Sequence, residues 1–131
     1  MLEAVTLLIA ARLLVARVPL ARWRRSLGAH APIVAPTPGT WLPGNLTARR
    51  LAWAVDRAAS SLPGRTLCLP RAMALQWMLR RRGLGGTLVI GVHPQRRRGG
   101  LDDLHAWVAR NGEILIGSID PMPSPIYAAR V

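Results

Sequence analysis

The amino-acid sequence predicts a single α+β domain in which helices come first and a small antiparallel sheet follows. The chain has 131 residues, which suits one domain, and 50% of them are apolar, which is enough to bury a core. Apolar residues at helical spacing dominate the first part of the chain, and short apolar runs typical of strands follow them. Because the helices precede the strands rather than alternate with them, the pattern favours the α+β class.

The composition excludes several classes of protein. Eighteen basic and six acidic residues give a formal net charge of +12. Wholesale disorder needs low hydrophobicity as well as high charge, so the apolar content excludes it. The single cysteine excludes an intrachain disulfide framework and a cysteine-rich zinc module, and we expect no metal or cofactor. A lone thiol fits the reducing cytoplasm.

Residues 1–27 form an N-terminal apolar and basic segment that we expect to be helical. It differs from a secretory signal because Glu3 is its first charge and because Arg12 and Arg17 interrupt the apolar run, which is also too short to span a membrane. The 3,4 spacing predicts one face that packs on the domain: Leu2, Val5, Ile9, Leu13, Ala16, Leu20 and Trp23. Apolar residues off that face are candidates for docking a partner protein or a membrane interface: Leu7, Leu8, Leu14 and Val15.

Residues 29–45 are rich in proline and glycine and predict an extended connector to the core of the domain at 46–131. Asn45 is the expected N-cap of a helix over residues 46–60. A second helix is expected over residues 68–82, with Pro70 in its first turn, where the missing N–H costs nothing. Gly83 stands just past this helix, where a left-handed residue commonly ends helices.

Three strands are expected after these helices. Thr87–Val92 reads as a buried strand. Leu104–Arg110 and residues 113–119 read as a hairpin, because Asn111-Gly112 between them is typical of a two-residue turn.

One cysteine and one histidine have the chemistry of a nucleophile and its base. Cys68 stands at the expected start of its helix, where free backbone N–H groups and the helix dipole favour a thiolate. His105 lies on the first strand of the hairpin, and a nucleophilic cysteine needs an imidazole within hydrogen-bond reach. His93 is an alternative base. A lone cysteine is nevertheless more often a small core residue, so the pair by itself proves little.

Four stretches around this pair carry a stronger signal: Cys68-Leu-Pro-Arg-Ala-Met-Ala-Leu-Gln-Trp-Met-Leu-Arg-Arg-Arg-Gly-Leu, Leu88-Val-Ile-Gly-Val, His105-Ala-Trp-Val and Asn111-Gly112. Together they resemble the transglutaminase-like, papain-related cysteine proteases. Within that group the chain is most similar to the split, stand-alone leader peptidases of lasso-peptide biosynthesis, over residues 46–119. The resemblance implies a transglutaminase-like (papain-like) core preceded by an apolar helix, with Cys68 as the nucleophile and His105 as its base.

The resemblance also implies a substrate and partners. Such an enzyme cuts a ribosomally made precursor between its leader and its core peptide, through a thioester, and so frees the core amine for macrolactam closure by a separate ATP-dependent cyclase. Longer relatives carry their own leader-binding module. Because this chain has no room for one, a separate small leader-binding protein is the implied partner. The backbone N–H of Cys68 is the candidate oxyanion-hole donor.

The expected third member of the triad is Asp120. In the simplest hairpin register His105 faces Ser118, which makes Asp120 its diagonal neighbour on the same face, with Cα atoms about 7 Å apart. Asp120 and the proline after it also look like the Asp-Pro of transglutaminase-like folds. Asn111 matches an often acidic position of the family, but six residues of strand put it roughly 20 Å from His105. A bulge would turn Asp120 to the other face. Two aspartates ahead of His105 would then be the next candidates: Asp102 and Asp103.

Three other functions stay open at this point. Arginine runs at residues 22–25, 49–50, 80–82 and 96–98 suit nucleic-acid phosphates, but no recognised binding motif accompanies them. Residues 1–27 suit a membrane-associated scaffold. A transglutaminase-like site also transfers acyl groups to amines or hydrolyses amides, and a triad alone does not distinguish these reactions. We favour the peptidase, with no nucleic-acid partner and without membrane association.

Overall fold

The α+β class is confirmed by the computed structural model of the chain. The structure describes residues 2–17, 29–30, 45–62, 68–92, 104–110, 113–117 and 124–130. Its elements are α1 (Leu2–Arg17), β1 (Ala29–His30), α3 (Leu46–Ser61), α4 (Cys68–Arg81), β2 (Thr87–Val92), β3 (Leu104–Arg110), β4 (Glu113–Ile116) and β5 (Ser124–Arg130).

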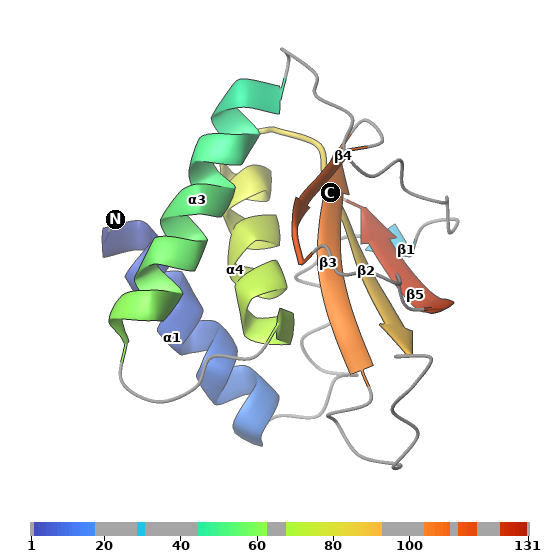
Figure 1. Cartoon of the computed structure of the whole chain (residues 1–131), viewed down its shortest axis with the longest axis horizontal. Coiled ribbons are helices and arrows are strands. Elements are labelled where there is room, and N and C mark those ends of the chain that lie inside the picture. Colours follow the sequence, from blue (N-terminus) through green and yellow to red (C-terminus); the bar gives the residue numbers. More distant parts are fainter. Residues whose placement is uncertain are drawn as a thin grey trace.

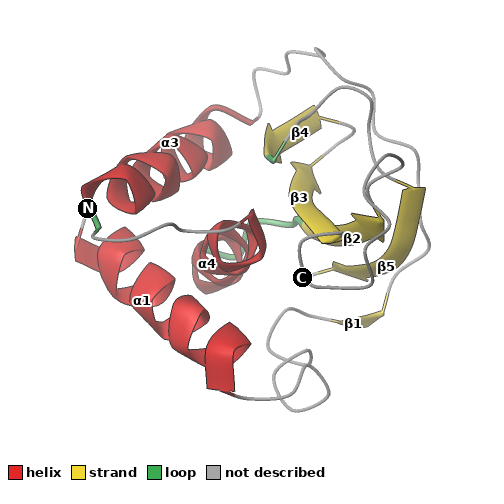
Figure 2. Cartoon of the chain, turned by 60° about the horizontal axis from the view of Figure 1, so that its bottom comes forward, coloured by secondary structure: helices red, strands yellow, loops and turns green. Residues whose placement is uncertain are grey.

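The molecule has a layer of helices on one side and an antiparallel sheet on the other (Figure 1). The strand order is β1-β5-β2-β3-β4, and every neighbouring pair is antiparallel. Helix α4 lies between the other two helices and the sheet, as Figure 2 shows from a second direction. Helix α4, which begins at Cys68, therefore contacts β3, the strand that contains His105.

Two strands were not predicted, β1 and β5. Strand β1 has only two residues, which is too short for a periodic signal. Strand β5 contains Pro125, which lowers its strand signal because proline cannot donate to a ladder. The structure accommodates this proline beside a register shift, since Pro125 pairs with Gly91 where the ladder slips between Ile90 and Gly91.

The hydrophobic core lies between the helices and one face of the sheet. Helix α3 contributes Leu51 and Val55, and α4 contributes Met73, Leu75 and Leu79. The sheet contributes Leu88, Ile90, Ala106, Val108, Ile116 and Ala129. A smaller cluster on the opposite face of the sheet holds Val89, Trp107 and Ala128.

The predicted apolar face of α1 is wrong. Leu2, Ile9 and Leu13 are 83%, 42% and 52% exposed, whereas the fully buried positions are Ala4, Leu8 and Ala11. The candidate docking residues pack on the core instead, since Leu8 is buried and Leu7, Leu14 and Val15 are partly buried against it. Because the helix is apolar on several sides, its periodicity does not predict which side is buried. The small side chains of Ala4 and Ala11 let α1 approach α3 and α4 closely, and this close packing decides which side is buried.

An ion-pair cluster joins the start of α1 to the end of α4. The Glu3 carboxylate lies 3.0 Å from Arg81 and 2.6 Å from Arg82. The Arg82 guanidinium donates to both carboxylate oxygens, and Arg81 contacts one of them, Oε1, so a single acidic side chain binds both arginines. Among the described helices, none has the length and apolar character needed to cross a membrane.

The ends of α4 follow the sequence signals. Pro70 lies in the first turn, as expected. At the other end Gly83 has φ +67°, the Leu84 N–H donates to Leu79 O at 2.9 Å, and the Gly83 N–H donates to Arg80 O at 3.1 Å. This pair of bonds is a Schellman motif, which satisfies carbonyls that the helix leaves open.

Asn45 precedes α3 as predicted but does not cap it through its side chain. It is fully buried, and its amide donates instead to Arg110 O at 2.9 Å and to Glu113 Oε2 at 3.5 Å. Arg49, one turn into α3, donates Nε to the same carboxylate oxygen at 2.9 Å and a second N–H to Glu113 Oε1. These contacts fix the start of α3 to the β3–β4 hairpin.

The hairpin register is one residue away from the prediction. Arg110 pairs with Glu113, which agrees with a two-residue connection, and Ala109 pairs with Ile114. Val108 then pairs with Ile116 and not with Leu115, because the register shifts between Val108 and Ala109. A bulge of this kind inserts one residue into one strand, and the side chains of that strand beyond the bulge turn to the other face of the sheet. Strand β4 ends at Ile116, three residues before the predicted end.

Candidate active site

Cys68 is the first residue of α4 and its side chain is partly buried. The sequence places it there because Pro70 and the following apolar run start a helix, while the preceding Pro63-Gly64 end the one before. Backbone N–H groups in the first turn of a helix have no partner within it, so they are available to a thiolate or an oxyanion. The Leu69 N–H donates such a hydrogen bond to the Cys68 sulfur.

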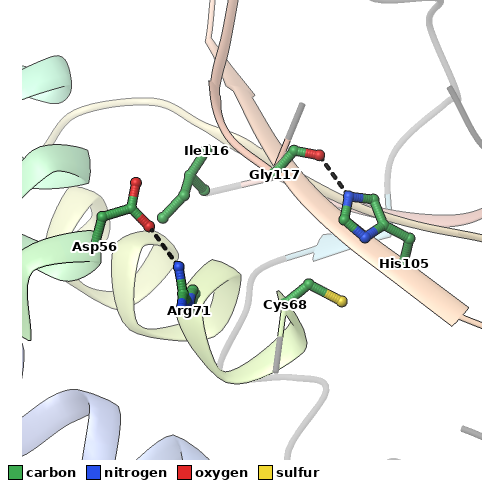
Figure 3. Close-up of a pocket in the computed structure, with 6 residues that line it drawn as sticks. All are labelled: Asp56, Cys68, Arg71, His105, Ile116 and Gly117. Carbon is green, nitrogen blue, oxygen red and sulfur yellow. Dashed lines mark hydrogen bonds and ion pairs between the residues drawn. The ribbon is translucent and has the colours of Figure 1, made fainter. Parts of the chain in front are cut away.

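His105 lies in the part of β3 before the residues that pair with β4, and there it meets Cys68. The two side chains form a hydrogen bond, and Figure 3 shows the Nδ1 side of the imidazole turned toward the sulfur. The Ala106 N–H, next along β3, also donates to the sulfur. The thiol therefore receives hydrogen bonds from α4 and from β3. The structure brings Cys68 and His105 together, and their roles as nucleophile and base stay a prediction.

The electrostatics of the pair favour a thiolate and an imidazolium. Burial raises the pKa of Cys68, but the hydrogen bonds from His105, Ala106 and Leu69 outweigh it, and the pKa is lowered from its ordinary value of 9.0. The hydrogen bond to Cys68 raises the pKa of His105 above 6.5, burial opposes the rise, and a hydrogen bond to Gly117 adds to it. The two shifts have the same cause, since each charged form stabilises the other.

A pocket of about 170 Å³ opens beside the pair and is lined by Asp56, Cys68, Arg71, His105, Ile116 and Gly117 (Figure 3). Arg71 lies one turn after Cys68 on α4 and donates to Asp56 of α3 at 3.2 Å. Ile116 and Gly117 form the wall on the β4 side. A substrate that reaches the sulfur therefore meets one ion-paired wall and one largely apolar wall.

Sequence reasoning missed four of these lining residues. Arg71 had a signal, because a residue three positions after Cys68 lies on the same side of a helix. Asp56 had none, since its meeting with Arg71 depends on how α3 packs against α4. Ile116 and Gly117 reach the pocket only through the shifted hairpin register.

The remaining candidates from the sequence fall in two groups. Asp120, Asn111, Asp102, Asp103 and His93 lie outside the described residues. Trp107, which follows His105 on the same face of β3, is 1% exposed and stacks on the His105 ring with centroids 6.3 Å apart. It is a core residue that also supports the imidazole.

The family model of the transglutaminase-like superfamily matches residues 11–126. This chain belongs to the transglutaminase-like superfamily. The match runs from within α1 to within β5, so it includes Cys68, His105 and the whole pocket. The searches of curated proteins and of solved structures returned no match.

Membership of the transglutaminase-like superfamily agrees with the geometry. The superfamily suits papain-like cysteine peptidases and acyltransferases, both of which need a thiol and a base within hydrogen-bond reach of each other. Among the described residues no cluster of three His, Cys, Asp or Glu side chains lies close enough to hold a metal ion.

Proposed function

We propose that this protein is a cysteine peptidase that removes the leader from a ribosomally made lasso-peptide precursor. The observation that carries the peptidase is the hydrogen-bonded pair of Cys68 and His105, whose pKa values shift toward thiolate and imidazolium at the mouth of an open pocket. The choice of a lasso precursor rests on the sequence resemblance over residues 46–119.

The reaction follows from the positions of the two groups. The Cys68 thiolate attacks the carbonyl carbon of the scissile amide, and the C–N bond then breaks as the His105 imidazolium gives its proton to the leaving amine. The leader is left as a thioester on Cys68, and the core peptide departs with a free α-amine. Water, deprotonated by His105, attacks the thioester, and the leader acid leaves as the thiolate forms again.

The developing oxyanion needs donors at the start of α4. We assign one of them to the backbone N–H of Cys68, which stands in the first turn of the helix, where N–H groups have no helical partner. The dipole of α4 directs its positive end to the same place.

The substrate class draws support from the charge of the chain. A formal net charge of +12 attracts an acidic leader peptide and raises its rate of encounter. Phosphate binding by the arginine runs is less favoured than the sequence implied, because Arg81 and Arg82 pair with Glu3 and because Arg49 pairs with Glu113. The partners that we propose are a separate small leader-binding protein and an ATP-dependent cyclase, both implied by the family resemblance.

The test is cleavage of a candidate precursor by the full chain together with its leader-binding partner, followed by mass spectrometry. We expect leader acid and free core peptide from the wild type, and neither from Cys68→Ala. This variant should keep the fold, because its side chain loses only the sulfur atom. Thr6→Ala, on the exposed side of α1, is the control that keeps wild-type cleavage. Iodoacetamide should label Cys68 well below pH 8.5, where an ordinary thiol ionises. Cleavage by Cys68→Ala, together with a thiol that resists labelling, would contradict the proposal.

The same assay separates hydrolysis from acyl transfer. When a primary amine is added in excess, a peptidase still yields leader acid, whereas an acyltransferase yields the leader amide with the mass of the amine added. Binding of arbitrary DNA that weakens steeply with salt would point instead to a nucleic-acid protein.

A further inference from the structure

The imidazole of His105 makes its second hydrogen bond to the backbone. Its Nε2 lies 2.5 Å from the carbonyl oxygen of Gly117. A carbonyl only accepts, so Nε2 carries the proton and Nδ1 is the atom available to the thiol, as the orientation in Figure 3 requires. Building on the thiol chemistry proposed above, we propose that the Gly117 carbonyl is the positioning group of His105, the part that an acidic side chain plays in a Cys-His-Asp triad.

The local backbone explains how a carbonyl comes to face the ring. The register of β3 with β4 shifts at Val108, and β4 ends at Ile116. Gly117 then adopts φ +86°, a left-handed conformation that turns its peptide group out of the ladder. Gly117 O is thereby directed at a histidine twelve residues earlier in the chain.

Only glycine fits this position. A Cβ at residue 117 would run into the carbonyl oxygen of Ala106 and would lie 3.0 Å from both Cα and Cβ of Trp107. Two of these three contacts are backbone atoms of β3, which cannot move aside as a flexible side chain can. The steric limit and the positive φ therefore act on the same residue, the one whose carbonyl holds His105.

The carbonyl also suits the charge change at the ring. A hydrogen bond from Nε2–H to a carbonyl fixes the tautomer of the neutral ring and favours the imidazolium that forms when His105 takes a proton. The hydrogen bond to Gly117 raises the pKa of His105, in agreement with this role. The pairing of Val108 with Leu115, on which the choice of Asp120 depended, is replaced by the pairing with Ile116.

The experiment compares the pH profile of iodoacetamide alkylation of Cys68 in wild type, Gly117→Ala and Gly83→Ala. Gly83 is the matched control: its φ is +67°, a Cβ there meets nothing within 4 Å, and it stands at the opposite end of α4. We expect the alkylation midpoint of Gly117→Ala to rise by about one pH unit, which is about tenfold less thiolate at neutral pH. Gly83→Ala should destabilise the fold yet keep the wild-type midpoint.

A second measurement covers the case in which Gly117→Ala does not fold. In Cys68→Ala, ¹⁵N NMR of the imidazole above its pKa should show the His105 proton on Nε2, and a proton on Nδ1 would overturn the proposal. A wild-type alkylation midpoint in folded Gly117→Ala, with a raised midpoint in Asp120→Ala, would overturn it as well. Both readouts are independent of any peptide substrate, so failure of the leader-peptidase assignment leaves this result standing.

Discussion

The buried contact between Arg49 and Glu113 offers the sharpest test of how the fold supports the site. The Glu113 side chain is 8% exposed and receives two N–H groups of Arg49 and the amide of Asn45. Substitution Glu113→Ala removes the carboxylate that the Arg49 guanidinium and the buried Asn45 amide both contact. It also removes the contact that holds the start of β4 to α3, and β4 leads to Ile116 and Gly117 in the pocket.

The size of the effect follows from burial. Removing one partner of a fully buried pair costs about 3–5 kcal/mol, whereas an exposed pair is worth about 0–1 kcal/mol. The Arg49 side chain is 24% exposed, so water partly replaces the lost carboxylate. We therefore expect Glu113→Ala to lower the free energy of unfolding by about 2–3 kcal/mol, which for a domain of this size is a fall in Tm of about 10 °C.

Urea unfolding followed by circular dichroism measures this loss, and a double-mutant cycle with Arg49→Leu isolates the pair. Glu3→Gln is the matched comparison, because its ion pairs with Arg81 and Arg82 lie at the surface, where those arginines are 63% and 38% exposed. We expect the Arg49–Glu113 coupling to exceed about 1.5 kcal/mol. A loss below about 0.5 kcal/mol for Glu113→Ala would refute the reasoning that this pair anchors the hairpin.

Two further predictions concern pH and the third triad member. Hydrogen bonds from Arg82 lower the pKa of the Glu3 carboxyl below its ordinary value of 4.5. The contribution of Glu3 to the free energy of unfolding is therefore present above pH 4.5 and is lost as the pH falls through the lowered pKa. Glu3→Gln should be less stable than wild type at pH 7, and calorimetry in acid should find the difference gone. The sequence prediction of Asp120 as the third triad member requires Asp120→Ala to lower turnover by orders of magnitude, whereas the Gly117 carbonyl in that place predicts turnover close to that of wild type. Asn111→Ala should only loosen the turn. Steady-state cleavage rates of the two variants decide, and a loss of orders of magnitude in Asp120→Ala would contradict the role of Gly117.

Local chemistry made much of the fold predictable. The bounds of β2 and β3 were predicted to the residue, and α3 and α4 to within one residue, because proline, glycine and apolar periodicity act within a few positions of one another. The pairing of Cys68 with His105 was predicted from a motif, since no local rule brings a helix start to a distant strand. Their hydrogen bond depends on the packing of α4 against β3.

Packing made the rest unpredictable. The face of α1 depends on which small residues, Ala4 and Ala11, meet the neighbouring helices, and an apolar helix has no single periodic face to reveal them. Gln76 is similar: it reads as an ordinary helical residue, yet it is fully buried and donates to Gly86 O at 3.2 Å and to Ala129 O at 3.0 Å. Its partners are backbone carbonyls, which every residue type possesses.

The same reason explains why the partner of His105 escaped the sequence. One extra residue in β4, Leu115, which has no partner where Val108 pairs with Ile116 and Ala109 with Ile114, changes which group faces the ring, and bulges leave only a weak mark in composition. A carboxylate partner would have been visible as an aspartate at a particular spacing. A carbonyl partner is common to all residues, so the chain records it only through the glycine that lets the backbone turn at φ +86°. In a short hairpin such as this one, a glycine just past the end of a strand is therefore as informative a position as any acidic residue nearby.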